Sequence, residues 1–207
     1  MASVSRINGF RLVGNFLTSS FNAQTVTAFH PSSDATVLMV GDIVKLTGDA
    51  RAASGAPTVT RITNGSTDIP FGVVVGISFE GQGDVTNVPP VNDLNTPIYV
   101  RASTDRYVTV CVDPNAVYEA QLLATSQSAA TITGNVGNNA PADITAGNTS
   151  TGASGMSIGT PATTATLPLK IVGFPARPDN VPGDTYFSYY VKLNSAVLGQ
   201  GTGTLGV

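Results

Sequence analysis

Short apolar runs separated by turn residues dominate the chain from residue 36 onward. The runs at 36–40, 43–46 and 58–62 are rich in β-branched residues and are bounded by turn pairs such as Gly41-Asp42 and Asn64-Gly65. Further runs of the same kind follow at 71–79, 98–101, 107–112, 167–174 and 186–194. Many short strands with turn signals between them are typical of an all-β fold. We predict an antiparallel sandwich or barrel, jelly-roll-like, with long loops and an extended N-terminal arm.

Two stretches within this pattern need a separate interpretation. Gly72 and Gly76 interrupt the apolar run 71–79, and glycines inside a strand predict a bulge, a bend or a close approach of another backbone. Asp113 and Pro114 precede the stretch up to residue 123. They fit the cap and first position of a helix, and the same residues also fit a strand that follows a turn.

Residues 1–35 are expected to form the arm, and residues 36–207 the β-rich body. Apolar side chains in the arm follow neither a helical nor a strand period. Two interpretations stay open: a loop folded onto its own body, or an anchor that inserts into another protein. The candidate anchors are Phe10, Leu12, Phe16 and Phe21.

Two further segments have unusual composition. Residues 125–166 are low in complexity, which suits either a flexible linker or long loops ordered by side-chain hydrogen bonds to the backbone. We expect order, because single apolar residues recur through the segment. The tail 195–207 is rich in glycine and needs a neighbour to hold it in one conformation. With the aromatic run before it, the tail predicts contact with other subunits, at an interface formed by Tyr186, Tyr189 and Tyr190.

The charge balance narrows the classes of partner. Charged residues make up 11% of the 207-residue chain, less than half of the usual ~25%. The net charge of −3 and the lack of a basic patch in the sequence argue against nucleic-acid binding. No apolar run approaches the ~20 residues that span a membrane. The N-terminus lacks the apolar stretch of a signal peptide, so direct export is disfavoured.

Residues that could carry chemistry are few. The single histidine, His30, is expected to be structural or simply exposed, and the single cysteine, Cys111, to be a small buried residue of an apolar strand. The aspartates adjoin turn residues, which explains them without a catalytic role. The glycines at 199–206 are not followed by a helix, so they do not match a phosphate-binding loop. We therefore expect no enzyme activity, no metal and no cofactor.

Several stretches together resemble the head decoration (cement) proteins of tailed bacteriophages and related structural proteins. The resemblance runs from about residue 8 to the end and is carried by the motifs at 41–46, 71–76, 118–121, 134–138, 169–173 and 191–194, and by the terminal Gly/Thr tail. It implies a β-rich body, homotrimers at three-fold positions of an icosahedral head, and binding to the major capsid protein. It also implies a place on the outer surface of the virion capsid, after synthesis in the host cytoplasm.

Two other functions are weighed against this one. A tail or fibre component with a receptor- or glycan-binding role would use the tyrosines at 186–190 to stack on sugars. A small β-sandwich hydrolase would need paired carboxylates that converge in a cleft. Copy number per particle separates a cement protein, present in hundreds, from a tail component, present in a handful.

Overall fold

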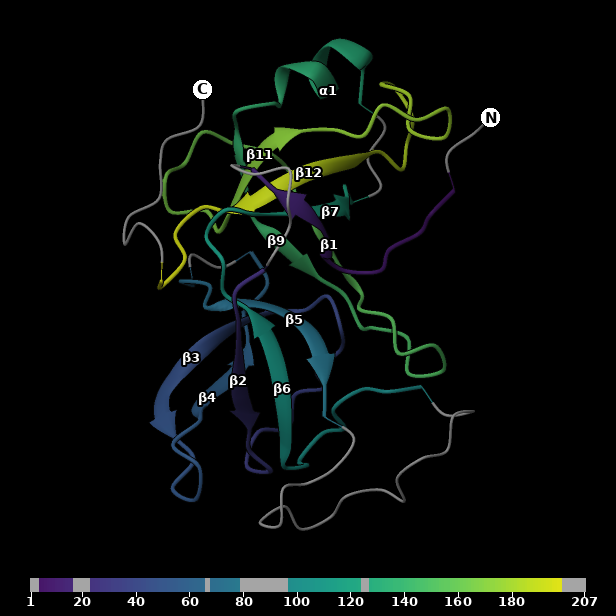
Figure 1. Ribbon diagram of the computed structural model, residues 1–207. Helices are drawn as coiled ribbons and strands as arrows, with labels where there is room; N and C mark the ends of the chain where they lie inside the picture. The colour runs from purple at the N-terminus through teal and green to yellow at the C-terminus, as the bar shows by residue number, and fades with distance from the viewer. Residues whose placement is uncertain (1–3, 17–22, 66–67, 79–96, 124–126, 199–207) are drawn as a thin grey trace.

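The computed structural model describes residues 4–16, 23–65, 68–78, 97–123 and 127–198. The described chain forms two β bodies, one above the other in Figure 1. The lower body is a closed barrel, and the upper body is an open sheet with one short helix at its far end. The structure thus confirms the predicted all-β class with a barrel and sheets.

The barrel contains five strands in the order β2-β4-β3-β5-β6, with β6 pairing back to β2. All of its pairs are antiparallel except the contact between β2 and β4. The strands are β2 (Thr25–His30), β3 (Ile43–Ala50), β4 (Pro57–Arg61), β5 (Gly72–Ile77) and β6 (Arg106–Cys111).

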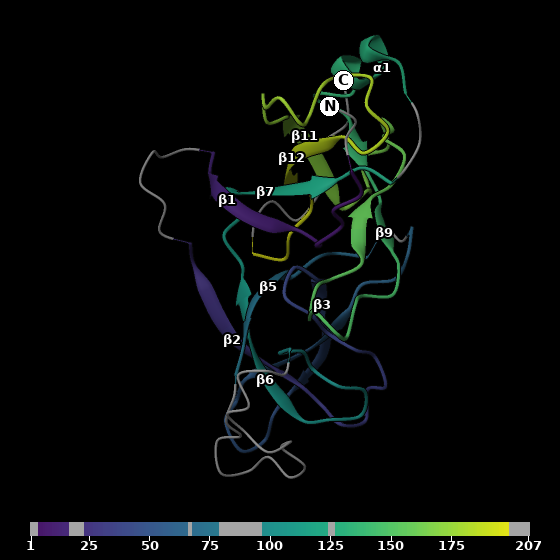
Figure 2. The same ribbon diagram turned by 90° about the vertical axis from the view of Figure 1, so that its right-hand side faces the viewer.

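The upper sheet has the antiparallel order β1-β7-β12-β11-β8, and a small hairpin of β9 and β10 packs beside it. Helix α1 (Ala129–Gly134) lies above β11 and β12 in Figures 1 and 2. Its Ser128 side chain caps the helix by accepting a hydrogen bond from the Thr131 backbone N–H. The strands are β1 (Arg11–Asn15), β7 (Ala116–Gln121), β8 (Asn139–Ala140), β9 (Ala142–Ile144), β10 (Met156–Ile158), β11 (Leu169–Gly173) and β12 (Ser188–Leu193).

Two hydrophobic cores hold the molecule together. One fills the barrel interior, with Val44, Val74 and Val110 among its buried members. The other lies under the upper sheet and includes Tyr118, Tyr189 and Ile132 of α1. Because Ile43, Val73 and Cys111 of the barrel strands belong to this second core, the two bodies share buried apolar surface.

The N-terminal region departs from the predicted arm. Residues 11–15 form the edge strand of the upper sheet, paired with β7, and residues 25–30 form a barrel strand. Figure 2 shows β1 and β2 as parts of the two bodies. Both strands pair with partners far along the chain, Arg11 with Glu119 and Thr25 with Cys111, so their local sequence carries no sign of the pairing. The described parts of residues 1–35 therefore contribute to both bodies, which corrects the expected separate arm.

A turn at Gly41-Asp42 joins three parts of the chain. Gly41 has a φ of 94°, which favours glycine, and its carbonyl accepts a hydrogen bond from the Phe10 backbone N–H at 2.9 Å. The buried Asp42 carboxylate accepts from the Met39 backbone N–H at 2.8 Å and from the Ser154 hydroxyl at 2.5 Å. The turn thus connects the N-terminal segment, the barrel and the loop before β10.

Burial raises the pKa of Asp42 above its usual range, and its hydrogen bonds from Ser154 and Met39 only partly offset this. The folded state therefore holds this proton to a higher pH than the unfolded state. In the unfolded chain, Asp42 has the ordinary aspartate pKa of about 4. The free energy of unfolding therefore falls as the pH rises from this value through the higher pKa of Asp42 in the folded state. We expect wild type to lose stability relative to Asp42→Asn over that window, as measured by urea unfolding at several pH values. A constant difference between the two proteins would contradict this assignment.

The ambiguous stretches now have definite structures. Residues 113–123 contain β7 and no helix. Gly76 lies at a register shift between β5 and β6, which confirms the predicted bulge. A side chain at Gly72 would collide with the Cys111 carbonyl, which confirms the predicted close approach of another backbone. Residues 127–166 contain α1, β8, β9 and β10. The last residues of the tail, 199–207, lie outside the described part of the chain.

Candidate functional site

The face of the upper sheet that points away from its core, called here the outer face, carries the candidate site. Alternate residues of each strand are buried: Tyr118 and Ala120 on β7, Tyr189 and Val191 on β12. Their neighbours therefore point outward. The register places Arg11, Glu119 and Tyr190 in one row across three strands. Further outward positions include Val117 and Gln121 on β7, Ser188 and Lys192 on β12, and Lys170 on β11.

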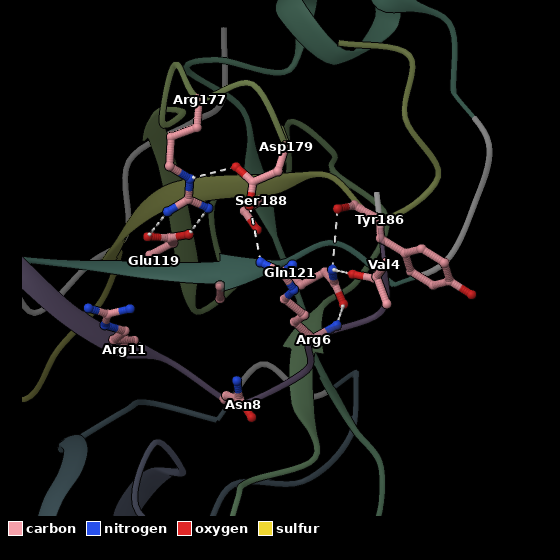
Figure 3. A pocket seen from close by; sticks show the side chains of 12 residues that line it. Val4, Arg6, Asn8, Arg11, Glu119, Gln121, Arg177, Asp179, Tyr186 and Ser188 are labelled. Carbon is pink, nitrogen blue, oxygen red and sulfur yellow. Dashed lines mark hydrogen bonds and ion pairs between the residues drawn. The ribbon is translucent and has the colours of Figure 1, made fainter. Parts of the chain in front are cut away.

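One half of the outer face is a polar cleft of about 370 Å³ (Figure 3). Arg177, from the loop after β11, makes a bidentate pair with Glu119 at 2.6 and 3.1 Å. Its Nε lies 3.4 Å from Asp179 Oδ1, and Asp179 Oδ2 accepts from Arg6 Nη1 at 3.1 Å. The network ties the N-terminal segment and the loop after β11 to the middle of the sheet.

The Gln121 side chain fastens residues 4–6 in the same cleft. Its Oε1 accepts from the Arg6 backbone N–H at 3.0 Å. Its Nε2 donates to the carbonyls of Val4 at 3.4 Å and Tyr186 at 3.2 Å. Because Gln121 is buried and both ends of its amide are used, the N-terminal segment has a fixed course along the cleft.

Local electrostatics differ between two cations of the outer face, Arg177 and Lys192. The hydrogen bonds to Glu119 raise the pKa of Arg177, so this guanidinium stays charged. Partial burial lowers the pKa of Lys192, and the nearby Asp113 carboxylate opposes that shift. Keeping the ammonium of Lys192 charged in this partly desolvated position therefore costs some folding free energy.

The other half of the outer face is an apolar hollow of about 350 Å³. Phe16 is 59% exposed at its rim, and Lys192 Nζ lies 5.2 Å from the Phe16 ring centroid. This distance permits a cation–π contact. The hollow is lined by Val13, Gly14, Asn15, Phe16, Val117, Val172 and Tyr190.

The structure does not place the candidate anchors of the arm on one surface. Phe10 is 2% exposed and belongs to the core under the sheet, so it is a core residue and its role as an anchor is corrected. Leu12 is half-buried and packs against the same core. Phe16 alone of the described anchors is exposed, and Phe21 lies outside the described residues.

The three tyrosines of the expected subunit interface are also separated. Tyr189 is fully buried, and its hydroxyl donates to the Ile132 carbonyl at 3.0 Å and accepts from Asn135 Nδ2 at 3.2 Å. It is therefore a core residue, which corrects its place at the interface. Tyr190 lines the apolar hollow, and Tyr186 lines the polar cleft with its ring directed away from the ion pairs (Figure 3).

The remaining candidate residues have structural roles. Cys111 is buried in β6, as predicted. His30 is fully buried, with Nε2 3.3 Å from Asp34, and desolvation lowers its pKa despite that neighbour. No group of three or more His, Cys, Asp or Glu side chains that could hold a metal ion occurs in the described part of the chain.

A second hollow, of about 620 Å³, lies on the barrel beside β2, β3 and β4. Two of the charged residues that line it, Asp34 and Arg51, have side-chain partners within the chain. Asp34 contacts His30, and the Arg51 guanidinium lies 4.5 Å from the Phe29 ring centroid and 3.6 Å from Asp105. We therefore regard the outer face of the upper sheet as the stronger candidate site.

The charged residues of the outer face were not singled out from the sequence. Their signal is the alternation Val117-x-Glu119-x-Gln121 and Ser188-x-Tyr190-x-Lys192, which places each set on one face of a strand. Reading 113–123 as a strand would have revealed the first set. Arg6 and Arg177 come from segments without such a period, and only the folded structure brings them together.

Comparison with known proteins gave no match to a family model, a curated protein or a solved structure. The class that the structure defines is thus the fold itself: an all-β protein with a closed five-stranded barrel joined to a five-stranded sheet. Among the residues that the structure describes, no helix has the length and apolar character needed to cross a membrane.

Proposed function

We propose that this chain is a viral structural protein, a cement protein that binds the major capsid protein at three-fold positions and stabilises the head. In this proposal it acts as a homotrimer on the outer surface of the capsid and catalyses no reaction. The resemblance of its motifs to phage decoration proteins is the starting point.

One structural observation supports this proposal above the others: the outer face carries an exposed aromatic ring, that of Phe16, beside an apolar hollow. Exposed aromatic residues next to a pocket are the usual centre of a protein–protein contact. Phe16 provides the exposed ring, and the half-buried Tyr190 lines the hollow beside it. A contact of modest strength is sufficient on a capsid, because a trimer engages several lattice sites at once and avidity multiplies the affinity.

The alternative role, a tail or fibre component that binds a receptor or glycan, would place its ligand in the polar cleft beside Tyr186. Stacking on a sugar needs an aromatic ring that faces the cleft. The Tyr186 ring points away from the ion pairs that dominate the cleft (Figure 3), so the geometry favours the cement role.

Reconstitution on heads tests this proposal. Heads of the virus that encodes the chain, produced without it, are titrated with wild type and with Phe16→Asp. We expect the variant to bind at least about tenfold more weakly, because a charge replaces the central aromatic contact. Phe16 is 59% exposed, so the free protein should keep its unfolding midpoint.

Ile69→Asp is the matched control, since Ile69 is 51% exposed and lies outside the outer face. It should bind like wild type. If wild type does not bind heads, the cement role is wrong. If both variants bind as wild type does, the outer face is not the contact.

A further inference from the structure

The outer face concentrates positive charge on an otherwise acidic chain. Of the 10 lysines and arginines, five lie on this face, whereas the whole chain carries a net charge of −3. Three carboxylates accompany them: Glu119 and Asp179 in the ion pairs, and Asp113 near Lys192. The face therefore keeps an excess of positive charge. The five cations are Arg6, Arg11, Lys170, Arg177 and Lys192.

Two of these cations oppose each other. Lys170 and Lys192 are direct cross-strand partners on β11 and β12. Both side chains lie on the outer face, since Leu169, Ile171, Val191 and Leu193 around them are buried. Like charges directly opposite each other destabilise a sheet. Lys192 Nζ already donates to Asn115 Oδ1 at 3.4 Å and has Asp113 nearby, and a carboxylate bound beside the two lysines would offset more of this repulsion.

The cationic pair borders the apolar hollow. Lys192 is the residue that approaches the Phe16 ring, and Val117, Val172 and Tyr190 form the hollow beside it. Positive charge and an apolar recess thus lie next to each other on one face. A ligand that fits both must carry negative charges close to an apolar side chain.

Resting on the proposed function, we propose that the outer face binds an acidic segment of the partner protein, with an apolar side chain of that segment in the hollow and its carboxylates near Lys170 and Lys192. In the assembled head this segment belongs to the capsid protein. Charge complementarity selects this occupant over a second copy of the chain. A second copy placed across a two-fold axis would bring the same cations against each other.

Synthetic peptides test the chemistry of the occupant on the intact protein. The first is a short glutamate-rich peptide with one central leucine, the second replaces glutamate with lysine, and the third replaces leucine with serine. We expect the first to bind, with an affinity that falls as salt is added, and the other two to bind at least about tenfold more weakly. Equal binding of the lysine peptide, or no binding of the glutamate–leucine peptide, would overturn the inference.

Variants locate the binding site. Lys170→Gln/Lys192→Gln should weaken binding of the glutamate–leucine peptide about tenfold or more. Lys45→Gln, a lysine on the barrel, is the control and should leave binding unchanged. An equal loss in both variants would show a general charge effect and would contradict the proposed site.

Two further measurements separate this inference from the cement role. If the peptide binds as expected but the protein does not bind heads, the site stands and the cement role fails. If the protein binds heads and the double variant binds them equally well, the cement role stands and the site is wrong. Sedimentation of the free protein completes the test: a change of oligomeric state in the double variant would identify the face as an interface between copies, against the inference.

Discussion

Deletion of residues 1–22 is expected to destabilise the whole protein, with a loss larger than the about 3–5 kcal/mol typical of removing one buried phenylalanine. The deletion removes Phe10, which is 2% exposed, and the complete edge strand β1. It also removes Arg6, which pairs with Asp179, and uncovers one edge of β7. Because whole domains are stable by only ~5–15 kcal/mol, much of the truncated protein should be unfolded.

Urea unfolding followed by circular dichroism measures this loss. Phe10→Leu serves as a milder control, because it keeps an apolar side chain in the core and should cost less than about 1.5–2 kcal/mol. A truncated protein with the wild-type midpoint would show that β1 and Phe10 contribute little. It follows that the anchoring role of this region is better tested by the point variant Phe16→Asp than by deletion.

Phe187→Ala is expected to cost about 3–5 kcal/mol of unfolding free energy. The Phe187 ring is fully buried and makes edge-on contacts with Phe174 at 5.3 Å and with Tyr189 at 5.0 Å between centroids. Each such aromatic pair adds ~0.5–1.5 kcal/mol beyond burial. The substitution leaves a cavity where the loop before β12 meets the core.

Phe174→Ala is the matched control for that experiment. Phe174 belongs to the same aromatic group but is only half-buried, so its removal should cost clearly less. Chemical denaturation of the two variants alongside wild type gives both values. Equal losses would mean that burial does not set the energetics of this cluster.

Much of the fold is predictable from local pattern. The runs at 43–46, 58–62 and 107–112 correspond to β3, β4 and β6, because β-branched residues bounded by turns favour strands without reference to the rest of the chain. The two glycines of β5 also carried local information, because glycine inside a strand indicates a bulge or a close backbone approach. Gly72 lacks a side chain where the Cys111 carbonyl approaches, and Gly76 accommodates the register shift.

The parts that local pattern missed depend on distant partners. The strand β1 has a register shift between Leu12 and Gly14, and its sequence Arg-Leu-Val-Gly-Asn does not alternate polar and apolar residues. Only its pairing with β7, about a hundred residues later, makes it a strand. Sequence reasoning therefore described residues 1–35 as an arm, and it placed Phe10 and Tyr189 at contacts with other proteins when both lie in the core.

The candidate site likewise has one part that the local sequence indicates and another part that depends on residues far apart in the chain. The period of two along β7 and β12 indicates which side chains share a face, and Tyr190, which was singled out from the sequence, lines the apolar hollow on that face. The bidentate pair of Arg177 with Glu119 joins residues 58 positions apart. The opposition of Lys170 and Lys192 depends on the register between β11 and β12. Neither relation can be obtained without the strand order.

Copy number in purified particles tests the cement role most directly. Quantitative mass spectrometry would give the molar ratio of this chain to the major capsid protein. The proposed role predicts a ratio near one, because decoration occupies equivalent positions over the whole lattice. A ratio on the order of one per hundred would place the protein in the tail and contradict the cement role, since avidity over many lattice sites requires many copies.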